Sequence, residues 1–353
     1  MSFAIGYIAG PFGAIFFGHI GDRKGRKVTM YASLLMMGIS TSIIGILPPA
    51  ASAGVGVVIV LQLMRLAQCF GRGGTWGGGI LMAYENVPEN KRSFYAAIPQ
   101  IGLPIGFGLS SILIAVPTLL LPEDIFFTWG WRIPFLAAII LTLIVIRQKG
   151  EMMETEDYKK AQAKLEAEEA EGKKHKVGFI PMVKGYWKTL LLGCGTRWVD
   201  GTFYNIFIVW ILSYCINWLG MPLIQTYIIT IIACIFKIPF TLFGGWCAQK
   251  LGNTRTFVIG ALASAVLSIP TLKVIELSKG NLAITIIGIV LGWSIAYNLI
   301  WAVISSLWSS YFETEVRYSG ISFVYHVPSF LVAGMVPTIC TLLINYGKVI
   351  RFM

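Results

Sequence analysis

The chain has 353 residues, of which 56% are hydrophobic and 13% are charged. Soluble domains carry about 25% charged residues, so this composition excludes an ordinary water-soluble protein. A net charge of +11 would suit nucleic-acid binding, but most basic residues lie between long apolar stretches, where such residues orient membrane helices. We therefore expect an integral protein of the lipid bilayer that binds no nucleic acid.

Ten apolar segments are long enough to cross a bilayer, which takes ~20 residues of helix. Membrane β-strands are shorter and alternate in polarity, so the segments predict an all-α membrane protein. No signal-peptide pattern precedes the first segment. The predicted spans are residues 3–20, 28–47, 56–83, 94–118, 132–147, 187–213, 221–246, 256–275, 282–308 and 317–344.

The charge of the connecting segments alternates along the chain. Arg23, Lys24 and Arg26 follow the first span and Lys91 and Arg92 follow the third, whereas residues 48–56 carry no charge. Because basic loops stay in the cytoplasm, we expect the first predicted span to run inward. That direction also predicts a further span upstream of it.

The longest hydrophilic segment divides five spans from five others. It predicts an N-terminal bundle at 1–147, a charged linker at 148–186 and a C-terminal bundle at 187–353. Glu156 precedes Lys160 by four residues, the favourable order for a helical ion pair, so the linker is expected to be helical. A solvated cytoplasmic connection is the simpler interpretation, and a regulatory role is the alternative.

A short glycine motif occurs once in each half. Gly18 and Gly25 bracket the first copy, and Gly245 and Gly252 bracket the second, each 227 residues later. Both copies follow an apolar span and precede another. Parallel halves of this kind are a known transporter architecture, with the solute site between the halves near the middle of the membrane.

The first copy resembles the loop signature G-x-x-x-D-R-x-G-R-K of the major facilitator superfamily. It matches at Gly18, Asp22, Arg23, Gly25, Arg26 and Lys27. Further stretches resemble the metabolite:proton symporters of that superfamily, namely RLAQ at 65–68, GGTWGG at 73–78, ENVP at 85–88, WGWRIPF at 129–135 and ETEVRYSG at 313–320.

This resemblance implies the major facilitator fold, with two pseudo-symmetric helical bundles and about ten of the usual twelve helices. It implies secondary active transport of a small organic solute, a carboxylate or a zwitterion, by alternating access with proton symport. We expect a monomeric, multi-pass protein of the cytoplasmic membrane, with the central loop inside and with no cofactor, metal or enzymatic activity. The alternatives are a truncated or degenerate transporter without activity, and a sensor derived from a transporter.

The resemblance also implies a gate on the cytoplasmic side. Its expected members are Gly18, Asp22, Arg23, Gly25 and Arg26, together with Glu85 and Arg317. An aspartate in this position stabilises the positive end of a helix dipole. The alternative is that these charges only set the membrane topology.

Charged residues inside membrane spans are costly and mark functional sites. If Arg72 and Lys237 both face a central cavity, they form an anion site, because arginine binds a carboxylate through two parallel hydrogen bonds. Arg197 and Asp200 are three residues apart on one helix face and are expected to pair.

The remaining candidates are polar residues within the spans. The complete predicted substrate-binding set is Arg72, Lys237, Gln68, Gln100, Arg197, Tyr204, Tyr297 and His326. For each neutral member, hydrogen bonding between helices is the alternative. Asp200 and His326 are the candidates for proton coupling, because Thr75 occupies the position of a family glutamate.

Overall fold

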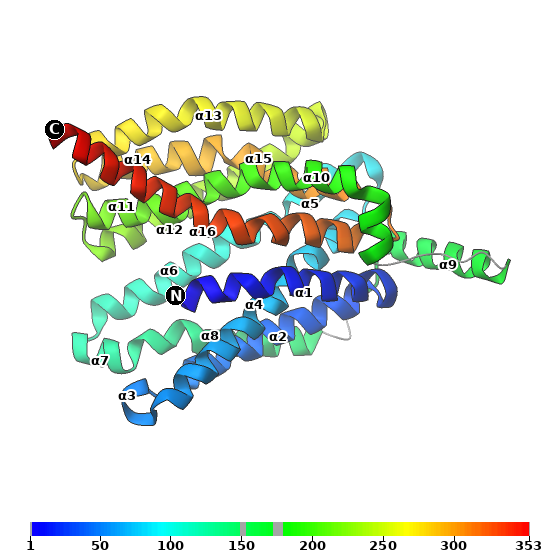
Figure 1. Ribbon diagram of the computed structural model, residues 1–353, viewed down its shortest axis with the longest axis horizontal. Coiled ribbons are helices and arrows are strands. Elements are labelled where there is room, and N and C mark those ends of the chain that lie inside the picture. Colours follow the sequence, from blue (N-terminus) through cyan, green and yellow to red (C-terminus); the bar gives the residue numbers. More distant parts are fainter. Residues whose placement is uncertain (1, 149–152, 172–178, 353) are drawn as a thin grey trace.

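The structure is a computed structural model that describes residues 2–148, 153–171 and 179–352. Every regular element in these ranges is a helix, so the predicted all-α class is confirmed (Figure 1). Nine of the helical segments among the described residues are long and apolar enough to cross a membrane. The predicted span at 3–20 lies in α1 (Ser2–Lys24), which is not one of the nine.

The first half of the chain consists of long helices joined by short ones. They are α1 (Ser2–Lys24), α2 (Arg26–Ile46), α3 (Ala50–Ala53), α4 (Val55–Tyr84), η1 (Glu89–Lys91), α5 (Arg92–Ala97), η2 (Pro99–Ile101), α6 (Gly102–Leu120), α7 (Glu123–Thr128), η3 (Gly130–Arg132) and α8 (Ile133–Arg147). α4 packs against α1 and α2, and α2 also packs against α8.

The second half is also helical and includes two π-helical stretches. Its elements are α10 (Phe179–Tyr204), η5 (Asn205–Trp210), α11 (Ile211–Asn217), α12 (Leu223–Leu251), α13 (Asn253–Leu277), α14 (Leu282–Ile289), η6 (Val290–Ala296), α15 (Asn298–Ser309) and α16 (Arg317–Phe352). The π-helical stretches are η5 and η6. π-Turns within helices are rare and occur frequently at functional sites.

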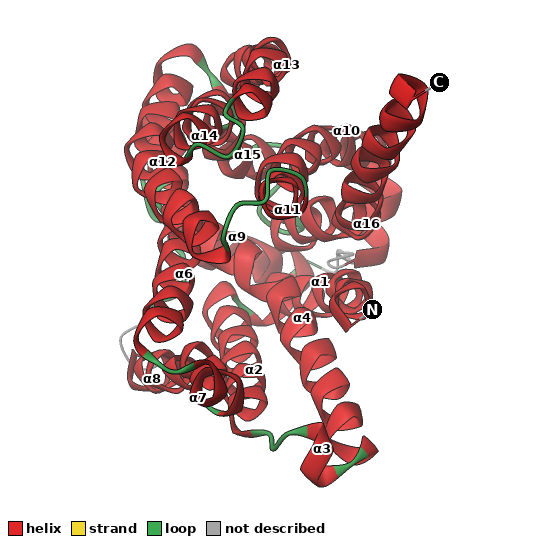
Figure 2. Ribbon diagram, turned by 90° about the vertical axis from the view of Figure 1, so that its left-hand side faces the viewer, coloured by secondary structure: helices red, strands yellow, loops and turns green. Residues whose placement is uncertain are grey.

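The helices form two groups (Figure 2). Between the groups, α1 packs against α16, and α12 packs against α5 and α6. The helix α9 (Glu156–Ala170) extends beyond one end of the molecule, which we call the linker end, whereas α3 and α7 lie at the opposite end (Figure 1).

The predicted linker contains α9, as its charge pattern indicated. Residues 149–152 and 172–178 of that linker lie outside the described residues. α10 begins at Phe179, before the span predicted at 187–213, and its backbone departs from helical geometry at Tyr186 (φ −119°). The apolar part of this helix therefore starts just after a kink that the sequence did not reveal.

The two glycine motifs have equivalent structural roles. Gly25 (φ 105°) and Gly252 (φ 90°) separate consecutive helices in a backbone conformation that favours glycine. A Cβ atom at Gly18 would lie 2.8 Å from Ser319 Cα, and one at Gly245 would lie 2.6 Å from the Ala97 side chain. Each motif therefore marks a place where one half of the chain closely approaches the other.

The glycine-rich segment of α4 brings three other helices close to it. A Cβ atom at Gly74 would lie 2.7 Å from the Phe17 side chain of α1. One at Gly77 would lie 2.7 Å from the Ser322 hydroxyl of α16. Small residues at membrane helix interfaces allow such close approach, so this segment of α4 contacts both halves at once.

Candidate functional site

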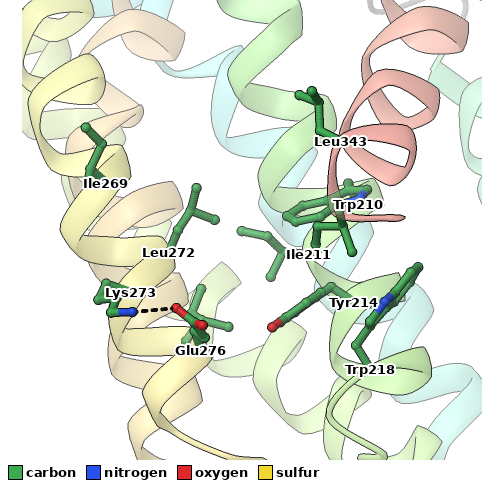
Figure 3. A pocket seen from close by; sticks show the side chains of 11 residues that line it. Trp210, Ile211, Tyr214, Trp218, Ile269, Leu272, Lys273, Glu276 and Leu343 are labelled. Atoms are coloured by element: carbon green, nitrogen blue, oxygen red, sulfur yellow. Dashed lines mark hydrogen bonds and ion pairs between the residues drawn. The ribbon is translucent and has the colours of Figure 1, made fainter. Parts of the chain in front are cut away.

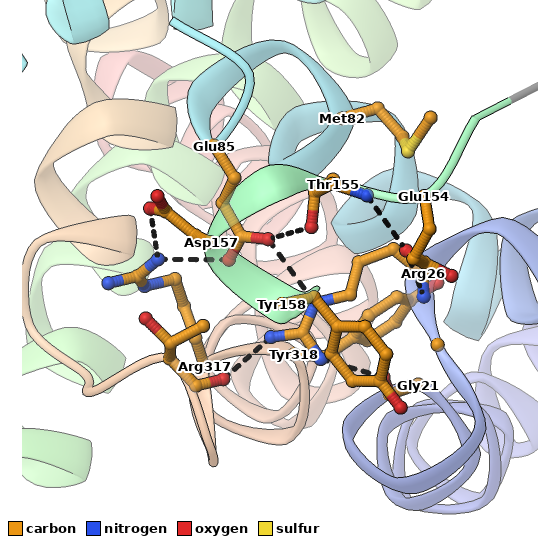
Figure 4. Close-up of polar contacts among 12 residues, drawn as sticks. Gly21, Arg26, Met82, Glu85, Glu154, Thr155, Asp157, Tyr158, Arg317 and Tyr318 are labelled. Carbon is orange, nitrogen blue, oxygen red and sulfur yellow. Dashed lines mark hydrogen bonds and ion pairs between the residues drawn. The ribbon is translucent and has the colours of Figure 1, made fainter. Parts of the chain in front are cut away.

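Four charged side chains are buried together at the linker end of the molecule. Figure 4 shows Arg26, Glu85 and Arg317 among them. We call this group, made of Asp22, Arg26, Glu85 and Arg317, the linker-end cluster. Asp22, Arg26 and Glu85 come from the first half of the chain, and Arg317 begins α16 in the second half. Buried charges need partners, and these residues supply them to one another.

Asp22 holds the start of α16. Its Oδ1 accepts a hydrogen bond from the Tyr318 backbone N–H (3.0 Å), and its Oδ2 accepts one from the Ser319 N–H (3.0 Å). A carboxylate at a helix N-terminus satisfies N–H groups that lack intrahelical partners and stabilises the helix dipole. The interaction joins the end of α1 to the start of α16.

Arg26 and Glu85 extend this contact. The Arg26 guanidinium donates to the Gly21 carbonyl (2.7 Å) and to the Thr314 carbonyl (2.6 Å), and its Nε lies 3.4 Å from Glu85 Oε2. Glu85 Oε1 accepts from the Arg317 guanidinium at 2.9 Å. One carboxylate therefore pairs with a guanidinium from each half.

The start of the linker covers this cluster, which sequence reasoning did not predict. The Thr155 hydroxyl donates to Glu85 Oε2 (2.6 Å), and Glu154 accepts from the Arg26 backbone N–H (2.9 Å). Asp157 pairs with Arg92 at 2.7 Å. No recognisable motif distinguished these residues from the rest of an acidic helix start.

Tyr158 adds an aromatic face to the cluster. Its ring lies 4.7 Å from the Arg26 guanidinium, and its hydroxyl donates to the Arg23 carbonyl at 3.0 Å. Burial raises the pKa of the Tyr158 hydroxyl, so the group stays protonated and remains a donor. Arg23 joins this contact through its backbone, and its side chain is exposed.

A second polar site lies between the two halves, in a cavity of about 180 Å³. α4, α6, α10, η5, α15 and α16 contribute to its walls. The polar and aromatic lining residues are Arg72, Arg197, Tyr204, Asn205, Trp301, Tyr325, His326 and Ser329. Four members of the predicted substrate-binding set therefore meet here: Arg72, Arg197, Tyr204 and His326.

Arg197 is held in place from several directions. It pairs with Asp200 one turn along α10, its Nε donates to Ser329 Oγ (3.0 Å), and its guanidinium lies 4.0 Å from the centre of the Tyr325 ring. Asp200 is fully buried, and its Oδ1 also accepts from the Tyr297 hydroxyl at 2.6 Å. The expected Arg197–Asp200 pair is present, and the carboxylate has two strong donors.

His326 follows Tyr325 on α16. The two rings meet edge to face with centres 4.8 Å apart, and His326 is only 3% exposed. Its Nε2 has no hydrogen-bond partner among the described residues. A buried imidazole nitrogen that borders a cavity without a partner can donate to, or accept from, a bound solute.

Aromatic residues from both halves meet next to the cavity. Trp76 lies one helical turn beyond Arg72 on α4 and stacks on Tyr325, with ring centres 4.3 Å apart. Gln100 accepts from the Trp76 indole (3.2 Å) and donates to the Trp301 carbonyl (2.9 Å). Gln100 of the first half is thus bonded to Trp301 of the second half.

The structure places three other predicted residues away from the cavity lining. Gln68 donates to Thr41 Oγ1 (2.7 Å) within the first half. Lys237 is fully buried in the second half, so it does not form the expected pair with Arg72 across the cavity. Tyr297 is connected to the site through its hydrogen bond to Asp200.

A larger apolar cavity of about 570 Å³ lies within the second half alone (Figure 3). It is bordered by stacked Trp210, Tyr214 and Trp218, and Lys273 pairs with Glu276 (2.9 Å) at its edge. A polar solute has few partners here, so the smaller cavity between the halves is the better candidate. Among the described residues, no group of three His, Cys, Asp or Glu could hold a metal ion.

Comparison with known proteins identifies the family. A sequence model of the Major Facilitator Superfamily matches residues 1–337. The chain is 33% identical over 352 residues to the inner membrane metabolite transport protein YhjE of Escherichia coli K12, covering 98% of this chain and 78% of that protein. It is 30% identical over 352 residues to the shikimate transporter of the same organism, covering 98% and 77%.

The solved structures agree with this fold. The proton:xylose symporter XylE bound to 6-bromo-6-deoxy-D-glucose matches with a TM-score of 0.77 and 16% identity, covering 99% of this chain and 79% of XylE. At this identity the match shows the fold alone. Together with the family match, it confirms the resemblance drawn from the loop motifs, and the chain belongs to the major facilitator superfamily of multi-pass membrane transporters.

Proposed function

We propose that this protein carries a small organic carboxylate across the cytoplasmic membrane by alternating access, together with protons, and acts as a monomer. The observation that carries the proposal is the cavity between the halves, which Arg72 and Arg197 border from opposite halves. Guanidinium groups bind carboxylates through paired, charge-assisted hydrogen bonds. The solute sites of transporters built from two halves typically lie between the halves, as this cavity does.

The charges at the cavity favour a carboxylate over a zwitterion. Asp200 is the acidic residue next to the lining, and it is fully buried and bonded to Arg197 and Tyr297. A zwitterion needs an anion or an open aromatic face for its cationic end. The Tyr325 ring is already occupied, because the Arg197 guanidinium lies over it and the Trp76 ring stacks on it. Because Arg72 and Arg197 border the cavity and the Asp200 charge is already paired, an anion is the better fit.

The linker-end cluster serves as the gate in this proposal. Its contacts connect α1 to α16 and Glu85 to Arg317, and they require the two halves to be close together. They stabilise the state that is closed at the linker end, and opening there must break them. Gly18 supports the same contact by allowing α1 to approach α16 at Ser319. Gly25 and the Arg23 carbonyl allow the linker to approach at Glu154 and Tyr158.

We expect the linker to lie in the cytoplasm, because the basic loops are at that end. A cysteine at Lys164, on the exposed part of α9, should react with a membrane-impermeant maleimide in inside-out vesicles. The same cysteine should be protected in intact cells. A cysteine at Val55, at the opposite end, serves as the control and should give the reverse pattern. Labelling of position 164 in intact cells would refute the orientation.

The proposed activity can be tested with purified protein in proteoliposomes. Uptake of labelled shikimate, 2-oxoglutarate, citrate, proline and betaine is measured with the outside at pH 5.5 or pH 7.5. The proposal expects uptake of at least one carboxylate, faster from the acidic side and inhibited by a protonophore. Preference for betaine or proline would contradict the carboxylate assignment. Absence of all uptake by folded protein would support the alternative of an inactive transporter.

A further inference from the structure

A buried lysine in the second half has no ion-pair partner among the described residues. Lys237 of α12 is 0% exposed. Its Nζ donates to Asn298 Oδ1 (2.9 Å) and, more weakly, to the Trp293 carbonyl (3.5 Å). It also lies 4.8 Å from the centre of the Trp293 ring and 4.5 Å from that of Tyr297. All of these partners are neutral.

The Lys237 site is connected to the cavity between the halves through Tyr297 and Asp200. Tyr297 lies under the Lys237 amine, and its hydroxyl donates to Asp200 Oδ1 at 2.6 Å. Asp200 in turn pairs with Arg197, which borders the cavity. Arg197, Asp200, Tyr297 and Lys237 therefore form a continuous buried line that starts at the proposed solute site.

This line contains two basic side chains, Arg197 and Lys237, and one carboxylate, Asp200. While Arg197 pairs with Asp200, the negative charge is neutralised and an ammonium on Lys237 has no countercharge beyond neutral acceptors and ring faces. Burying such a charge is unfavourable. When a solute carboxylate draws the Arg197 guanidinium toward the cavity, the Asp200 charge becomes available to Lys237, and the ammonium is stabilised.

On the basis of the proposed function, we propose that Lys237 is the proton-binding group of this transporter, and that it takes up a proton when a carboxylate binds at Arg197. The proton comes from the solution on the open side and adds to the neutral amine. It returns to solution on the other side when the carboxylate leaves and Arg197 pairs with Asp200 again. No other bond is formed or broken.

The titratable and charged groups that face Lys237 are consistent with this assignment. They are Asp200 from α10, Tyr297 between η6 and α15, and Cys234 one turn earlier on α12. Asp200 accepts hydrogen bonds from Arg197 and Tyr297.

The test compares the wild-type protein with Lys237→Arg, which is always protonated, and Lys237→Met, which is never protonated. Shikimate and the other carboxylates of the transport panel are added to purified protein in a weakly buffered solution with a pH indicator. Binding is measured by calorimetry from pH 5.5 to pH 8.5. We expect wild-type protein to take up about one proton per carboxylate, and its affinity to increase as the pH falls, because the two sites are linked.

Both variants should take up no proton, and their affinities should not change with pH. Lys237→Arg should match the wild-type affinity at low pH, and Lys237→Met should match that at high pH. Proton uptake that persists in either variant would overturn the assignment, as would loss of carboxylate binding by both variants while they remain monodisperse. Wild-type binding without proton uptake would overturn this inference alone, whereas wild-type protein that binds no carboxylate would overturn the proposed function as well.

Discussion

Replacing Arg72 with alanine is expected to reduce carboxylate uptake by roughly 100-fold. Arg72 is the cation that the first half contributes to the cavity lining. A hydrogen bond to a charged group contributes ~1.5–3 kcal/mol, and a paired guanidinium–carboxylate contact contains two such bonds. Uptake at several solute concentrations gives KM and Vmax for the variant. We expect the loss mainly in KM, because the role proposed for Arg72 is solute binding and not gating.

Arg65 provides the matched control for Arg72. It is an arginine on the same helix, but it donates to Gln68 (3.2 Å) and lies over the Phe135 ring, away from the cavity lining. Arg65→Ala should therefore keep uptake within a few-fold of wild type. Equal losses in the two variants would indicate that α4 needs its charges for folding, and unchanged uptake by Arg72→Ala would remove the anion site.

The fold was predictable from the sequence because membrane insertion imposes simple rules. A long apolar run must be helical, since hydrocarbon leaves backbone groups no other partners. This accounts for the spans between residues 28 and 344, which agree with the nine membrane-length helices within the described ranges. Departures such as the kink at Tyr186 and the π-helical stretches η5 and η6 depend on tertiary packing, which a hydropathy pattern does not contain.

The site was predictable only in part, for a related reason. Hydropathy shows that Arg72 and Lys237 lie within spans, but it does not show which way each side chain points. Arg72 borders the cavity, whereas Lys237 faces Asn298 inside its own half. Contacts of the linker, such as Thr155 with Glu85, join positions 70 residues apart and carry no local signal.

The two polar sites have different relations to the interface between the halves. At the linker end, Asp22 and Glu85 bond directly to groups of the other half, so these contacts depend on the relative position of the halves. Around Asp200 and Lys237, all of the bonds lie within the second half, so they can persist while the halves move. We infer that the linker-end cluster controls access to the cavity from that end, whereas the buried line from Arg197 to Lys237 controls the binding of the proton.

This division predicts that Glu85→Gln opens the linker end. Glu85 lies between Arg26 and Arg317, and all three side chains are at most 10% exposed. Removing one member of a buried ion pair costs about 3–5 kcal/mol, because the remaining charge is left without compensation. In the open state water can solvate these guanidiniums, so the cost falls on the closed state. A shift of this size changes the ratio of two states by roughly 100-fold or more.

A cysteine introduced at Ser322 can measure whether the linker end opens. Ser322 is fully buried and faces Gly77, at the contact between α16 and α4. With the six native cysteines replaced by alanine, Ser322→Cys should react slowly with a maleimide in the wild-type background and at least 10-fold faster with Glu85→Gln. Glu89→Gln is the matched control, because the Glu89 side chain is 90% exposed and lies 3.8 Å from Arg92. Slow labelling in a monodisperse Glu85→Gln protein would show that the cluster stabilises the fold without controlling the gate.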